Sequence, residues 1–196
     1  SLIFCCPFDA LGATIATYGG QNVGAGKVSR IGEGVKVCMT LGSVYSLLAF
    51  ALFFLAGDRL ALLFVVGETA RIIANARMFL LCNSLFYIPL AAVNVYRFVI
   101  QGVGYSQVAI LAGVFEMAAR TAVGLLFVPG IGFTAACVAN PAAWIAADLF
   151  LIPTYIYCMK RLGLRIASQN ADCEENETPE ERRILPGQGR LRPRRP

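Results

Sequence analysis

Long apolar runs with very few charges are the feature that most constrains the fold of this chain. Hydrophobic residues make up 57% of the sequence and charged residues only 15%, with a mean hydropathy of +0.64. Soluble domains are typically about 45–50% apolar and about 25% charged. The composition therefore predicts an all-α membrane protein.

Five stretches approach the roughly 20 apolar residues that a spanning helix needs. We expect residues 1–165 to form a bundle of about five transmembrane helices, and residues 166–196 to form a disordered cytoplasmic tail, because that tail is polar and contains proline. Pro89 lies inside the third stretch and predicts a bend there. The expected helices cover about residues 1–18, 35–56, 70–100, 107–128 and 133–161.

The basic residues predict how the bundle lies in the cell membrane. One side would receive the loop at residues 27–36, the turn after Arg97 and the end of the last stretch, and it carries more Lys and Arg than the other side. Cytoplasmic loops are enriched in these residues, so we expect a multi-pass protein with a cytoplasmic C-terminus. The net charge of +5 then reflects membrane orientation, and we expect no nucleic-acid partner.

The stretch "TYGGQNVGAGK" looks like a loop that binds phosphate. A Walker A loop has the pattern G-x-x-x-x-G-K-[ST], but this chain has Gln21 at the first glycine position and Val28 after the lysine. We therefore interpret the stretch as a cytoplasmic turn in which Gln21 and Asn22 cap the end of the first helix. A similar "QGVG" turn begins at Gln101.

Small side chains recur along the last apolar stretch. Ala135, Ala139, Ala143 and Ala147 are spaced four residues apart and so share one helical face. Small residues allow helices to approach closely in lipid, where burial of apolar surface gives little driving force. This stripe predicts tight packing against a neighbouring helix.

Charged residues at membrane depth are candidate functional residues, because each costs about 2.5–3.5 kcal/mol at a helix centre. Glu116 and Arg120 are four residues apart and can pair, either as a structural ion pair or as part of ion coupling. Asp9 has no base at a suitable spacing and is either a coupling site or an interfacial residue. Asp148 could bond to a neighbouring helix or take part in coupling.

Three stretches together resemble the multidrug and toxic compound extrusion (MATE) transporters. They are "PFDALGATIATYGGQNVGAGKVSRIGEGVK", "RFVIQGVGYSQVAILAGVFEMAARTAVG" and "GIGFTAACVANPAAWIAADLFLIPTYIYCMKRL". The resemblance covers about residues 2–162. It implies the C-terminal lobe of a twelve-helix, two-lobe transporter, whose partners would be the lipid bilayer, small organic substrates and the N-terminal lobe of the same protein.

The resemblance also implies a function, namely export of organic, often cationic compounds by alternating access, driven by Na⁺ or H⁺. It implies neither enzymatic activity nor a cofactor beyond the coupling ion. Some members carry an acidic residue in the helix that matches residues 72–100, where this chain has none. Two alternatives are a lipid-precursor flippase of a related family and a non-transporting fragment. The candidate cavity or hinge residues are Asn94, Gln21, Asn22, Gln101 and Pro141.

Overall fold

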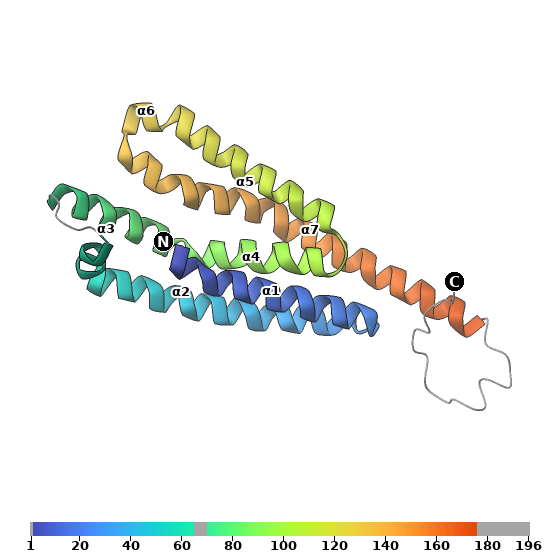
Figure 1. Ribbon diagram of the computed structural model, residues 1–196. Coiled ribbons are helices and arrows are strands. Elements are labelled where there is room, and N and C mark those ends of the chain that lie inside the picture. Colours follow the sequence, from blue (N-terminus) through green and yellow to red (C-terminus); the bar gives the residue numbers. More distant parts are fainter. Residues whose placement is uncertain (1, 65–69, 176–196) are drawn as a thin grey trace.

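The protein is a bundle of long helices that run in similar directions (Figure 1). The computed structural model describes residues 2–64 and 70–175, and every regular element in this part of the chain is helical. The all-α fold is therefore confirmed. The helices are α1 (Leu2–Gly24), α2 (Val28–Phe64), α3 (Ala70–Leu85), α4 (Tyr87–Gly102), α5 (Ser106–Leu126), α6 (Val128–Ile131) and α7 (Phe133–Glu175).

Within the described residues, three helices are long and apolar enough to cross a membrane, and a fourth span is added if the bent pair α3 and α4 counts as one. These are candidate spans of a membrane protein, as the composition predicts. The expected number of about five included the first stretch, whereas α1 is not among the helices that meet these criteria. The spans are Val28–Gly57, Ser106–Leu126, Phe133–Gln169 and the pair Ala74–Leu85 with Tyr87–Gly102.

The first helix continues beyond its expected end near residue 18. The Asn22 side chain donates a hydrogen bond from Nδ2 to the Tyr18 carbonyl at 2.8 Å, one turn back in α1. The reversal follows at Gly26, whose φ of 68° lies in the left-handed region that glycine adopts readily. Most of the glycine-rich stretch is thus helical, and only residues 25–27 form the turn before α2.

The bend predicted from Pro89 lies three residues earlier in the chain, at Phe86, between α3 and α4. The axes of the two helices differ by 53°. A proline has no backbone N–H and its ring clashes with the carbonyl four residues before it, which here belongs to Leu85, the last residue of α3. Pro89 therefore lies in the first turn of α4, where a missing N–H is tolerated.

The last helix passes through Pro141 and Pro153 without a break and continues to Glu175. Residues 166–175, expected to begin the disordered tail, are therefore helical. Leu162 and Ile166 are buried against the apolar residues of α1, α2 and α4 at this end of the bundle, which explains the extension. The rest of the expected tail, residues 176–196, lies outside the described residues.

The predicted alanine stripe forms part of the interface between α5 and α7, which lie side by side (Figure 1). Ala143 and Ala147 on α7 are fully buried, as are Ala109 and Ala112 on α5. Small side chains on both helices allow this close approach, as expected for helices in lipid.

An equally close contact joins α1 and α4. A Cβ atom added at Gly102 would clash with the backbone of Ala16, and one added at Gly20 would lie 3.2 Å from the Gly102 carbonyl oxygen. Glycine at position 102 is thus required by the proximity of another backbone. By contrast, a Cβ at Gly113 on α5 would meet open space.

We predict that Gly102→Ala lowers the free energy of unfolding by about 1–3 kcal/mol, because the added methyl group forces α1 away from α4. The matched change Gly113→Ala should be neutral or slightly stabilising, since alanine favours a helix over glycine by about 0.8–1.0 kcal/mol. Unfolding of the two purified variants by increasing denaturing detergent measures both effects. Equal stability of the two variants would contradict the tight α1–α4 contact.

Candidate functional site

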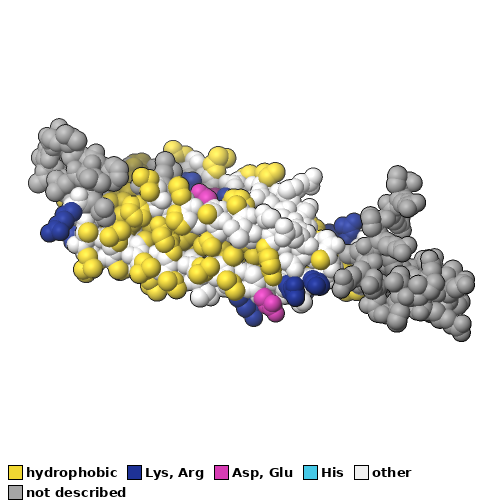
Figure 2. Space-filling model, turned by 60° about the horizontal axis from the view of Figure 1, so that its bottom comes forward, with side chains coloured by type: hydrophobic (Ala, Val, Ile, Leu, Met, Phe, Trp, Pro, Cys, Tyr) yellow, Lys and Arg dark blue, Asp and Glu magenta, His cyan; other side chains and the backbone are white. Residues whose placement is uncertain are grey.

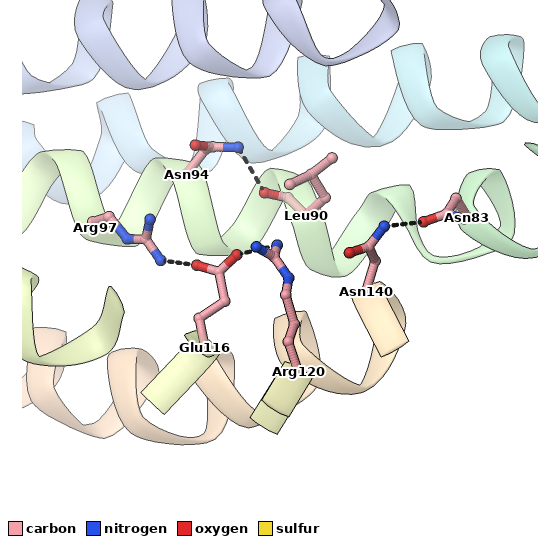
Figure 3. A network of polar contacts seen from close by, with 7 residues as sticks. All are labelled: Asn83, Leu90, Asn94, Arg97, Glu116, Arg120 and Asn140. Carbon is pink, nitrogen blue, oxygen red and sulfur yellow. Dashed lines mark hydrogen bonds and ion pairs between the residues drawn. The ribbon is translucent and has the colours of Figure 1, made fainter. Parts of the chain in front are cut away.

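Three charged residues of the apolar stretches, Arg97, Glu116 and Arg120, form a network between α4 and α5 (Figure 3). Arg97 on α4 donates from Nη2 to Oε2 of Glu116 on α5 at 2.5 Å. Arg120, one turn further along α5, donates from Nη2 to Oε1 of the same carboxylate at 2.5 Å. Glu116 therefore lies between two guanidinium groups, one from its own helix and one from α4.

The sequence pattern predicted only half of this network. The spacing of four residues predicts the Glu116–Arg120 pair, whereas the sequence places Arg97 only as a basic residue before a cytoplasmic turn. In the structure Arg97 lies inside the bundle, and its side chain is 23% exposed compared with 44% for Arg120. A sequence signal was present, because an Arg inside one apolar stretch and a Glu inside the next require partners at similar depth.

Glu116 has a hydrogen-bond partner for each of its two carboxylate oxygens. Its side chain is only 13% exposed, and both of its oxygens accept a charge-assisted hydrogen bond. The three residues together carry one excess positive charge. A second carboxylate nearby is therefore electrostatically favoured.

Asp148 on α7 is that second carboxylate. Asp148 interacts electrostatically with Arg97 on α4. It also interacts electrostatically with Tyr96, the residue before Arg97. One oxygen of Asp148, Oδ1, is buried with no hydrogen-bond partner, and so is Nε of Arg97. The site thus contains an acceptor and a donor of opposite charge that are both unused.

A second polar contact lies beside the α3–α4 break (Figure 3). Nδ2 of Asn140 on α7 donates to Oδ1 of Asn83 on α3 at 3.1 Å, and Asn83 itself is buried. Pro141, a candidate hinge residue, follows Asn140 and is fully buried within α7. The amide pair therefore fixes α3 to α7 at the level of the break.

The candidate amide residues occupy two kinds of position. Asn94 and Asn22 are each 8% exposed, and each donates to the carbonyl four residues earlier in its own helix. Gln21 and Gln101 are exposed near the ends of α1 and α4. Only the two glutamines are therefore open to solvent or to another part of a larger protein.

A shallow, open groove with a mainly apolar surface runs along α1. Its volume is about 490 Å³, and it is lined by Ala13, Thr14, Thr17, Tyr18 and Gln21. Asp9 lies four residues before Ala13 on the same exposed side of the helix. Asp9 is thus separated from the network of α4, α5 and α7. In the part of the chain that the structure describes, no three His, Cys, Asp or Glu side chains are grouped to hold a metal ion.

Comparison with known proteins gives the family of the chain and a solved structure with a similar fold. The MatE family model matches residues 1–126. The fold is similar to that of a solved structure described as the inward-facing conformation of a multidrug resistance MATE family transporter of the MOP superfamily, with a TM-score of 0.58 and 16% identity. A search of curated proteins found no match. The chain therefore belongs to the MatE family.

The structural match also shows how much of the solved transporter this chain covers. The match covers 83% of this chain and 42% of the solved transporter. The chain thus spans less than half of that protein, consistent with the expectation of one lobe of a two-lobe transporter.

We predict that Arg97→Ala lowers the free energy of unfolding by about 1.5–3 kcal/mol, because it removes a charge-assisted hydrogen bond between two helices. The matched change Arg120→Ala should cost only about 0.3–0.5 kcal/mol, since that pair lies within one helix and is more exposed. Unfolding in denaturing detergent provides the comparison. A larger loss for Arg120→Ala would overturn the assignment of Arg97 as the interhelical partner.

Proposed function

We propose that this chain is the C-terminal lobe of a cation-coupled multidrug efflux antiporter that exports organic cations by alternating access. Family membership supports a transport role, and the similar solved structure is described as a multidrug resistance transporter. The observation that carries the proposal is the contrast between the exposed face of α1 and the exposed faces of α2 and α5.

The exposed faces of α2 and α5 are suited to lipid. They present large apolar side chains such as Leu48 and Leu55 on α2 and Ile110 and Leu125 on α5. Figure 2 shows hydrophobic side chains over the middle of one face of the bundle, with basic side chains near both ends. This distribution matches a bilayer core between two head-group layers.

The exposed face of α1 has a different composition. Asp9, Thr14, Thr17 and Gln21 are exposed there together with small alanines. A polar face at membrane depth is stable only where it meets water or protein. We infer that this face borders the central cavity between the two lobes.

The α1 groove has the chemistry that an organic cation requires. The Tyr18 ring can accept a cation over its face, the Asp9 carboxylate supplies negative charge on the same side of the helix, and the threonine and glutamine side chains can accept or donate hydrogen bonds. The threonine hydroxyls already donate to carbonyls of α1, at 2.8 Å for Thr14 and 3.1 Å for Thr17, so their lone pairs remain available as acceptors.

The orientation proposed from the sequence agrees with the arrangement of the helices. The α1–α2 turn, the α4–α5 turn and the C-terminal part of α7 lie toward the same end of the bundle (Figure 1). That end carries several bases, and enrichment of Lys and Arg marks cytoplasmic loops. We therefore propose that this end faces the cytoplasm. The bases are Lys27, Arg30, Lys36, Lys160, Arg161 and Arg165.

We predict that Thr17→Trp in the full-length protein abolishes export of ethidium from cells, because the indole fills the α1 groove. The control Leu48→Trp places the same side chain on the lipid-facing side of α2 and should leave export unchanged. Collapse of the H⁺ and Na⁺ gradients should stop export by the wild type. Export that continues without either gradient would contradict cation coupling, and lipid translocation without ethidium export would favour a flippase.

A further inference from the structure

Three acids among the described residues, Asp9, Glu116 and Asp148, lie in different environments, and the surroundings of Asp148 favour reversible ionisation inside the bundle. Both carboxylate oxygens of Glu116 accept hydrogen bonds from arginines. Asp9 lies exposed on α1. Asp148 is partly buried, and its Oδ1 atom has no hydrogen-bond partner. Burying an unpaired carboxylate oxygen costs much more free energy than burying the same oxygen in a protonated, neutral carboxyl.

We propose that Asp148 binds and releases a proton during transport, and that Arg97 exchanges between two partners, Glu116 when Asp148 is protonated and Asp148 when the proton leaves. This inference rests on the proposed function, because it names the coupling ion and the coupling group of this lobe. The described arrangement corresponds to the protonated state, in which Arg97 is held by Glu116.

Two ring contacts follow Asp148 along α7. Phe115 on α5 packs against Phe150 on α7, with ring centroids 4.9 Å apart. Tyr96 on α4 packs against Tyr155 on α7, with centroids 5.2 Å apart. Asp148 and Tyr155 are seven residues apart and so share one face of α7. Phe150 is two residues after Asp148, or about 3 Å along the axis, so the Phe115 contact places Asp148 near the level of Glu116, whereas Tyr155 lies about 10 Å further along α7.

Every helix packed against α7 contributes to these surroundings. From α4 come Tyr96 and Arg97. The charged residues of α5, Glu116 and Arg120, pair with each other, and Glu116 also pairs with Arg97. The contact of α3 with α7 at Asn140 is about 12 Å further along the helix. The contribution of α2 is apolar, through residues such as Phe53 that pack in the core with Trp144, and the short helix α6 contains no titratable residue. Arg97 is therefore the positive charge available to Asp148.

The exchange leaves no carboxylate without a partner. When the O–H bond of Asp148 breaks, the proton passes to water, and the carboxylate can accept a hydrogen bond from Nε–H of Arg97, which is unused in this structure. Glu116 then keeps Arg120 as its partner. Arginine stays protonated throughout, so the proton on Asp148 is the only one gained or lost.

A proton fits this site better than a metal cation does. A hard cation such as Na⁺ needs several oxygen ligands, as the six to eight of a calcium site illustrate. A single carboxyl beside an arginine instead requires only one proton to become neutral.

The exchange also links proton binding at Asp148 to the contacts between helices. Arg97 bridges α4 to α5 when it binds Glu116, and it bridges α4 to α7 when it binds Asp148. Loss of the proton therefore moves one strong interhelical contact from one helix pair to another. Such a change can bias a transporter between two conformations, because each state holds a different pair of helices together.

Infrared difference spectroscopy of the full-length protein in lipid vesicles tests the inference without a transported substrate. The stretching band of a protonated carboxyl should appear in the wild type when the pH is lowered and should be lost in Asp148→Asn. The matched control Glu33→Gln removes an exposed carboxylate near the cytoplasmic turn and should keep the band. Persistence of the full band in Asp148→Asn would overturn the proposal.

A second variant tests the exchange of Arg97 and does not require Asp148→Asn to fold. Glu116→Gln frees Arg97 to pair with ionised Asp148, so the Asp148 band should weaken at the same pH. An unchanged band would overturn the exchange. Ethidium export driven by a pH gradient is measured on the same vesicles. If the band behaves as expected but the wild type exports no ethidium, then the proposed function fails and the protonation of Asp148 stands.

Discussion

Neutralisation of charge inside the membrane is the constraint on which the arrangement of this lobe depends. Glu116 cannot be inserted cheaply into lipid without a cation beside it. The structure supplies two, and the one from α4 ties that helix to α5. The α7 helix packs against both α4 and α5. The Arg97–Glu116 ion pair, which joins α4 to α5, therefore also determines which charged groups lie near Asp148. The functional inferences about proton binding follow from this one carboxylate and its arginines.

Close contacts between backbones define the rest of the architecture. Gly102 against Ala16 joins α4 to α1, and buried alanines join α5 to α7. The α4 helix therefore links the side of the bundle that carries the α1 groove to the side that carries the charge network. This geometry gives a physical route by which an event at Asp148 can reach the groove on α1.

The fold could largely be predicted from the sequence, because spanning helices leave long apolar runs and small-residue stripes. The Glu116–Arg120 pair was also predictable, since both residues lie on one helix. The partnership of Arg97 with Glu116 was not, because it depends on how α4 and α5 pack. The break at Phe86 was predicted only approximately, and the extension of α7 past Arg161 depends on buried contacts of Leu162 and Ile166 that local composition does not reveal.

The most direct test of this account is a double-mutant cycle between Arg97 and Glu116 in denaturing detergent. The account predicts a coupling free energy of about 1–3 kcal/mol between Arg97→Ala and Glu116→Ala, as expected for residues in one ion-pair network. A coupling energy indistinguishable from zero would contradict the claim that this interhelical pair organises the lobe.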